Sequence, residues 1–248
     1  MISQNPVPGE RRKKTVFDAA LKSKEDNMVM ISKKIKTFHF TGCIEIKELL
    51  GKKADNELQL MEILEDVPED CIYYHTHSYF LRHFYLAGQY PNDFANWAAI
   101  QVRDRVLGEK LGMVTPSADK TFDNIRTELI DIIDKHLSSI SIIPAVAYGE
   151  PFYFMRSRII EVPLGVSAGN LKEFTEAMKN VHASAIYNHI FESRLRVRKG
   201  KSDFSIWLDE VLGVGGLAEK IERIDCYMYS LEDLRAKIIQ LCEEEFRG

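Results

Sequence analysis

Hydrophobic positions recur at helical spacing along most of the chain, and two short aromatic segments read instead as extended strands. The extended segments are "KTFHFTG" at 36–42 and "EPFYFMR" at 150–156. Between residues 70 and 86, Ile72, His75 and Arg82 fall on one helical face together with Tyr79. The pattern predicts helices over these ranges: 57–66, 70–86, 171–180 and 184–198.

Capping residues mark the starts of two further helices in each half of the chain. Asn92 and Ser202 are each followed by an aspartate, which suits the N-terminal end of a helix. "TFDN" at 121–124 and "SLED" at 230–233 resemble capping boxes. The sequence therefore predicts four helices after each extended segment.

The same order of segments occurs twice. An offset of 114 aligns Phe38 to Arg82 with 152–196 without a gap, and 14 of these 45 positions are identical. Offsets of 110 and 109 align "DFANW" with "DFSIW" and "TFDNIRTELIDII" with "SLEDLRAKIIQLC". We expect a mainly α fold of two tandem copies of one four-helix module, each preceded by a short extended aromatic segment. The expected divisions are a basic, partly disordered tail at 1–34, copy one at 35–140 and copy two at 141–248.

Charge is unevenly placed along an otherwise ordinary globular composition. The 248 residues are 45% hydrophobic and 28% charged, with a net charge of −4. Residues 1–36 hold nine Lys/Arg and four Asp/Glu, so the remainder is acidic. No apolar run approaches the roughly 20 residues of a membrane span. The four cysteines lie far apart, which suits a reducing compartment. We expect a cytoplasmic protein that has no membrane partner.

Several polar and aromatic residues recur in both copies, and they support two interpretations. His75, Arg82 and Asp93 could form a catalytic or anion-binding group, with the histidine as proton carrier. They could equally form a buried polar network in which Asp93 pairs with Arg82. Recurrence favours the network, because an active site need not be duplicated. The counterparts in copy two are His189, Arg196 and Asp203, and the tryptophans Trp97 and Trp207 also recur.

Differences between the copies favour copy one as the place of a ligand site. His77 and His83 stand where copy two has Phe191 and Val197. His75 and His77 lie about 200° apart on a helix and cannot share an ion, so no metal site is expected. No cofactor-binding motif is present, and no cofactor is expected. The candidate ligand-binding residues are His77, Tyr79, His83, Trp97, His189, Arg196, Asp203 and Trp207.

Three motifs and their second versions carry a resemblance to a known family. "IYYHTHSYFLRH", "PNDFANW" and "LGEKL" recur as "IYNHIFESRLR", "SDFSIWL" and "LAEKI". Together they resemble a prokaryotic family of tandem helical repeats that is catalogued as a domain of unknown function. The resemblance covers Phe38 to Phe246 and implies no activity or catalytic residue.

These observations leave three functions open. The first is a non-enzymatic helical protein that binds a partner protein, a second copy of itself or a small anionic ligand. The alternative is an enzyme with a His75/Arg82/Asp93 cleft that acts on a phosphorylated or sugar-like small molecule. The third is a nucleic-acid binder that uses residues 1–36 and 194–201; we do not expect it, because no aromatic stacking residues accompany these basic positions.

Overall fold

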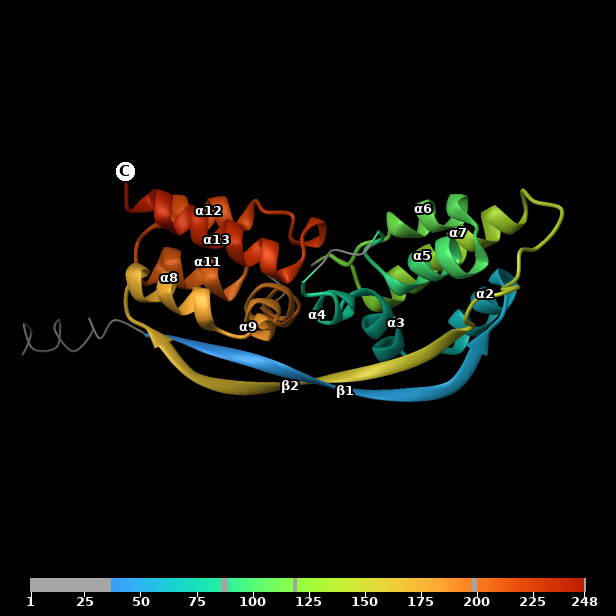
Figure 1. Ribbon diagram of the computed structural model, residues 1–248, viewed down its shortest axis with the longest axis horizontal. Coiled ribbons are helices and arrows are strands. Elements are labelled where there is room, and N and C mark those ends of the chain that lie inside the picture. The colour runs from blue at the N-terminus through green and yellow to red at the C-terminus, as the bar shows by residue number, and fades with distance from the viewer. Residues whose placement is uncertain (1–36, 86–88, 118–119, 198–199, 248) are drawn as a thin grey trace, which may run out of the picture. The chain divides into compact units, whose positions relative to one another are not determined.

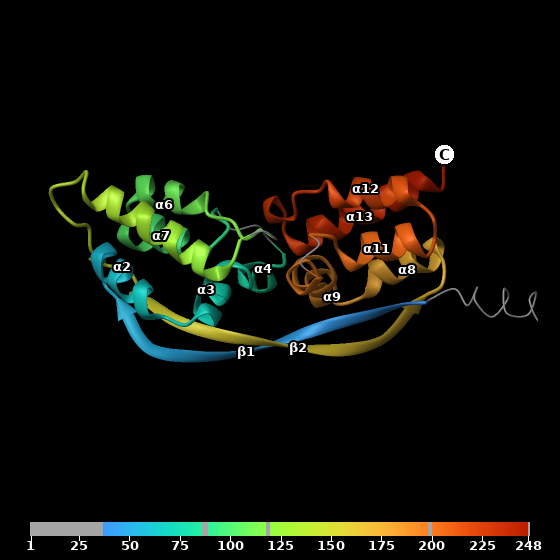
Figure 2. The same ribbon diagram turned by 180° about the vertical axis from the view of Figure 1, so that it is seen from behind.

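Two long strands form the base of the fold. The computed structural model describes residues 37–85, 89–117, 120–197 and 200–247. β1 (Phe38–Ala54) and β2 (Phe152–Ala168) pair as an antiparallel two-stranded ribbon. All helices drawn for the described part of the chain lie on one face of this ribbon (Figures 1 and 2). The extended aromatic segments are thus the first residues of strands that pair with each other.

The two ends of the ribbon are built alike. Phe38 lies opposite Ala168 at one end, and Phe152 lies opposite Ala54 at the other. The register shifts once near each end, beside a glycine in the left-handed region: Gly51 with φ of 71° and Gly165 with φ of 69°. A residue with a side chain is strained at such φ values, which explains why glycine stands at both positions. Phe38 and Phe152, Gly51 and Gly165, and Ala54 and Ala168 are each 114 residues apart.

Helices follow each strand in a matching order. After β1 come α2 (Glu57–Asp66), α3 (Glu69–Thr76), α4 (Tyr79–Arg82), α5 (Asp93–Trp97), the π-helix η1 (Ala98–Val102), α6 (Arg105–Gly112) and α7 (Phe122–Leu137). After β2 come α8 (Leu171–Asn180), α9 (Ala183–Tyr187), the π-helix η2 (Asn188–Glu192), α10 (Ser193–Val197), α11 (Asp203–Glu210), α12 (Gly215–Glu222), the 3-10 helix η3 (Cys226–Met228) and α13 (Leu231–Glu245). We call residues 57–137 the first lobe and residues 171–245 the second lobe.

Side-chain caps fix where most of these helices begin. Asn56 and Asn170 accept hydrogen bonds from the third backbone N–H that follows them, with nearly identical backbone angles. Asn92 and Ser202 cap α5 and α11 in the same way. Thr121 and Asn124 form a complete capping box at α7, as the sequence predicted.

Each strand begins under the lobe that belongs to the other half of the sequence. Phe38 and Phe40 are buried in a core with Phe174, Phe204 and Trp207 of the second lobe. Phe152 and Phe154 are buried in a separate core that belongs to the first lobe, which contains Phe94 and Trp97. The halves therefore exchange their aromatic strand starts, and neither lobe has a complete core without the other half.

The predicted fold class was wrong. The extended segments are not short leaders but 17-residue strands that form an antiparallel sheet. The helix expected at 70–86 is divided into α3 and α4, because the chain turns at His77 and Ser78. The third expected helix is likewise a five-residue α-helix that continues as a π-helix. The lobes are thus not two four-helix modules, and the exchanged strands explain why neither is self-contained.

The predicted divisions of the chain are not tested by the structure. The basic tail predicted at 1–34 lies outside the described residues, and the division between 140 and 141 stays a prediction. In the described part of the chain, no helix combines the length and the apolar character needed to cross a membrane.

Candidate functional site

His75 joins the first lobe to the strand exchanged from the second half. Its Nε2 accepts a hydrogen bond from the backbone N–H of Met155 at 3.0 Å. Its Nδ1 lies 2.8 Å from Asp93 Oδ2, and the same carboxylate pairs with Arg82. Burial lowers the pKa of His75, so the imidazole is neutral at pH 7 and Nδ1–H is the donor to Asp93.

Asp93 and Arg82 complete this network within the protein. Burial opposes the charge on Asp93, but the hydrogen bond from His75 and the charge of Arg82 hold the pKa of Asp93 below its usual value. Arg82 also donates to the Tyr74 carbonyl at 2.8 Å, and its guanidinium lies 3.9 Å from the centre of the Tyr74 ring. The guanidinium of Arg82 and the carboxylate of Asp93 therefore both have partners within the protein.

The second half repeats the arrangement. His189 Nε2 accepts from the N–H of Thr41 at 2.9 Å, and its Nδ1 lies 2.9 Å from Asp203 Oδ2. Arg196 pairs with the same aspartate at 3.1 Å. Each histidine thus fixes the strand that comes from the opposite half. These contacts favour the structural interpretation of both triads, and the catalytic interpretation stays an unsupported prediction.

The remaining sequence candidates fall in three places. Trp97 and Trp207 are core residues, and the Trp97 indole donates to the Glu150 carbonyl at 2.9 Å. The rings of Tyr79 and His83 stack with their centres 4.0 Å apart, beside a hollow of about 240 Å³. Residues of both lobes line this hollow, and His77 also lies where the two lobes meet.

Matching tyrosines of the two halves meet at this junction. The hydroxyls of Tyr73 and Tyr187 lie 2.9 Å apart, and Tyr73 donates to Glu192 Oε1 at 2.6 Å. His77 Nε2 lies 3.5 Å from the same oxygen. Burial lowers the pKa of His77 to about 3. Burial also raises the pKa of Glu192, although hydrogen bonds from Tyr73 and Tyr187 act to lower it. Burial therefore acts against the charged form of both side chains at the junction.

An open groove of about 690 Å³ lies beside the junction, a size that suits a small-molecule or peptide site. Ser157 Oγ and Asp70 Oδ1 are buried and have no hydrogen-bond partner among the described residues. Such atoms are costly to leave unpaired. The groove is lined by Pro68, Glu69, Asp70, Tyr73, Phe122, Ser157, Arg158, Ile159 and Glu192.

The corresponding positions of the other half differ in chemistry. There Cys43 Sγ is 3.7 Å from the Ser184 carbonyl, so the equivalents of Ser157 and Asp70 contact each other. None of the four charged residues of the groove has a charged counterpart on that side, where Glu45 instead stands opposite Ile159. At an offset of 114, the pairs are Glu69 with Ala183, Asp70 with Ser184, Arg158 with Ile44, and Glu192 with Ser78. The charge pattern of the groove is thus specific to one side of the ribbon.

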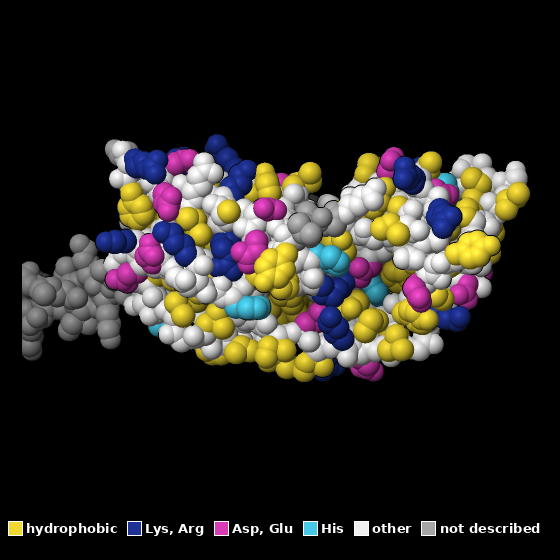
Figure 3. Space-filling model, in the orientation of Figure 1, with side chains coloured by type: hydrophobic (Ala, Val, Ile, Leu, Met, Phe, Trp, Pro, Cys, Tyr) yellow, Lys and Arg dark blue, Asp and Glu magenta, His cyan; other side chains and the backbone are white. Residues whose placement is uncertain are grey.

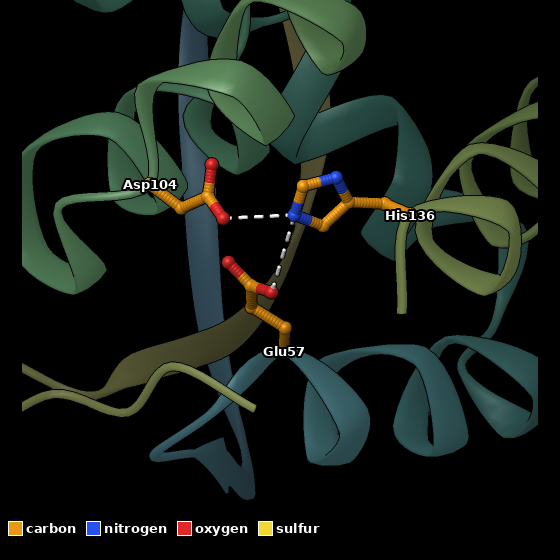
Figure 4. Close-up of side chains that lie close together, drawn as sticks. All are labelled: Glu57, Asp104 and His136. Atoms are coloured by element: carbon orange, nitrogen blue, oxygen red, sulfur yellow. Dashed lines mark hydrogen bonds and ion pairs between the residues drawn. The ribbon is translucent and has the colours of Figure 1, made fainter. Parts of the chain in front are cut away.

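A second polar cluster lies inside the first lobe. His136 Nε2 is 2.8 Å from Asp104 Oδ2 and 4.0 Å from Glu57 Oε2 (Figure 4). Burial and the charge of Asp104 raise the pKa of Glu57 to about 7. Burial acts against the charge of Asp104, but bonds from the Leu107 N–H and from His136 hold the pKa of Asp104 below its usual value. A divalent metal ion is one group that two carboxylates and an imidazole could hold.

The fold defines a protein in which two helical lobes share one two-stranded ribbon. The chain belongs to a family of unknown function, DUF5752, whose profile matches residues 35–243. The family resemblance found in the sequence is confirmed, although the description of that family as tandem helical repeats is not. A search of curated proteins found no match.

One solved structure has a similar fold, that of OrfY from Thermoproteus tenax. It has a TM-score of 0.67 and 24% sequence identity, over 84% of this chain and 95% of that chain. At this identity the likeness concerns the fold alone.

Sequence reasoning missed both the groove and the cluster around Glu57. The one usable signal was a difference between the halves. Polar residues of the first half at positions 57 and 104 stand opposite Leu171 and Val214 of the second. His136 stands opposite Glu245. A charged residue that replaces an apolar one at an expected core position is a candidate for chemistry.

Proposed function

We propose that this protein is a non-enzymatic binding protein whose junction groove takes an extended, basic segment of a partner protein. The observation that carries the proposal is the pair of unpaired buried polar atoms, Ser157 Oγ and Asp70 Oδ1, in the wall of an open groove. Binding would supply the missing hydrogen bonds.

The edge of β2 supports an extended ligand. The N–H of Met155 points away from β1, because it donates to His75. Along a strand in an antiparallel pair, alternate N–H groups face the same edge, so those of Ser157 and Ile159 face the groove side. The pairing with β1 continues without a shift from Met155 to Pro163. An open strand edge of this kind can pair with a further strand.

The charges of the groove favour a basic ligand over the anionic one that the sequence suggested. Glu69, Asp70 and Glu192 line it, against the single cation of Arg158. The rings of Tyr73 and Phe122 also line it, and aromatic faces attract cationic side chains.

Hydrophobic side chains on the outer face of the ribbon lie next to this edge. Ile44, Ile46 and Ile160 are 58%, 55% and 47% exposed. Figure 3 shows hydrophobic side chains along the lower margin, where the ribbon lies. A partner longer than the groove could cover part of this face.

The test uses a blocked synthetic peptide of three Lys-Val repeats, titrated into the full chain by isothermal calorimetry. We expect it to bind, whereas a Glu-Val peptide of the same length does not. Methylation of alternate backbone nitrogens should weaken binding, because it removes the donors that pair with β2.

Two charge reversals serve as matched variants. Glu69→Lys should weaken binding roughly fivefold or more, because it replaces attraction with repulsion worth about 1 kcal/mol. Glu65→Lys makes the same change on an exposed position of α2 that does not line the groove, and should leave affinity unchanged. Equal binding of the Lys-Val and Glu-Val peptides, or equal effects of the two variants, would refute the proposal.

A further inference from the structure

Three helix ends bring Glu57, Asp104 and His136 together. Glu57 is the first residue of α2, Asp104 is the N-cap of α6, and His136 lies in the last turn of α7. The ligand atoms of the three side chains lie within 4.8 Å of one another. Figure 4 shows all three pointing toward a common centre.

Glu57 is the unsatisfied member of the cluster. Its side chain is fully buried, yet neither carboxylate oxygen has a hydrogen-bond partner among the described residues. Asp104, by contrast, caps the N–H of Leu107 at 2.8 Å and pairs with His136. A buried carboxylate with no partner is strongly unfavourable, so its retention calls for a partner that the protein alone does not supply.

We propose that Glu57, Asp104 and His136 bind one zinc-class divalent cation, which joins the ends of three helices in the first lobe. One imidazole and two carboxylates suit Zn²⁺, whereas Mg²⁺ and Ca²⁺ favour sites made of oxygen ligands. This inference is independent of the junction groove, because none of the three residues lines it.

The spacing of the donors fits such an ion after small shifts. Tetrahedral ligands at about 2.1 Å from zinc lie roughly 3.4 Å from one another. His136 Nε2 is 2.8 Å from Asp104 and 4.0 Å from Glu57. Each distance needs a change of about 0.6 Å, which side-chain rotation provides. Water would complete the coordination, because the cluster supplies three ligands.

Lys110 opposes the ion in a way that can be measured. Its ammonium nitrogen lies 3.4 Å from His136 Nδ1. A neutral imidazole that binds a metal through Nε2 carries its proton on Nδ1, which then faces a cation. Lys110 must turn away when the ion binds. Lys110→Ala should therefore bind the ion more tightly than the natural sequence.

The experiment is a titration of the tag-free, chelator-treated full chain with Zn²⁺ in competition with a chromophoric chelator, and with Co²⁺ followed by its visible absorption. We expect one tight site per chain. Glu57→Gln and His136→Gln should each weaken it roughly 100-fold or more. Glu57→Gln introduces a neutral side chain of the same shape, so it should fold, and circular dichroism checks this.

Matched controls separate this site from surface binding. Glu65→Gln and His83→Gln alter a carboxylate and an imidazole outside the cluster and should leave zinc affinity unchanged. Zinc should also raise the melting temperature of the natural chain and not of Glu57→Gln. Zinc binding of equal strength in folded Glu57→Gln, or no binding to the natural chain, would overturn the proposal.

Discussion

Replacing Phe152 with alanine tests the exchange of strands. Phe152 belongs to the second half, yet its ring lies 5.0 Å from Phe94, 5.8 Å from Trp97 and 4.6 Å from His75, all of the first half. It is 4% exposed. A buried Phe→Ala change costs about 3–5 kcal/mol. The additional aromatic contacts place Phe152→Ala toward the upper end of this range.

The two tryptophans allow each lobe to be observed separately. Trp97 reports on the first lobe and Trp207 on the second, so the change is made in Trp207→Phe and Trp97→Phe backgrounds. We expect urea unfolding at lower concentration and a melting temperature lower by about 6–20 °C. In the folded protein, Phe152→Ala should change the near-ultraviolet circular dichroism signal of Trp97, observed in the Trp207→Phe background. It should leave the signal of Trp207, observed in the Trp97→Phe background, unchanged. The opposite pattern, with only the Trp207 signal altered, would show that Phe152 packs in its own half.

Two further predictions concern hydrogen bonds and protonation. His75→Gln and His189→Gln should each lower the free energy of unfolding by about 1–3 kcal/mol, because each ring holds a strand N–H and an aspartate. Thermal melts check this with His39→Gln, an exposed position, as control, and a loss confined to His75 would contradict the shared structural role. In metal-free protein, stability relative to Glu57→Gln should fall between pH 5 and pH 7. The folded state keeps a proton on Glu57 up to a pKa of about 7, whereas the unfolded chain releases it near 4.5. Denaturation curves that shift in parallel for the two proteins would rule this out.

Local sequence signals identified the caps and the strand starts. The capping pair of Thr121 and Asn124 was visible, because such contacts span only a few residues. The extended character of Phe38 and Phe152 was also correct. Their destination could not be predicted, because the same aromatic pattern fits the core of either lobe. The pairing of β1 with β2 joins residues that are 98 to 130 positions apart, from Ala54 with Phe152 to Phe38 with Ala168, which no local pattern reveals.

The candidate sites show the same limit. His77 was selected because the second half has Phe191 there, and it does lie at the junction. The recurrence of Tyr73 was also noted, but not that its hydroxyl meets that of its own counterpart. Glu57 and His136 are 79 positions apart, and only the tertiary packing of α2 against α7 brings them together.

The exchanged strands also determine when the protein can fold during its synthesis. The helices of the first lobe are complete at Leu137, but Phe152 and Phe154 of their core emerge from the ribosome later. At about 5–20 residues per second, the unfinished apolar surface waits on the order of seconds for its strand. The second lobe receives Phe38 and Phe40 from a segment made long before. The first lobe therefore stays incomplete during synthesis until the start of β2 has left the ribosome.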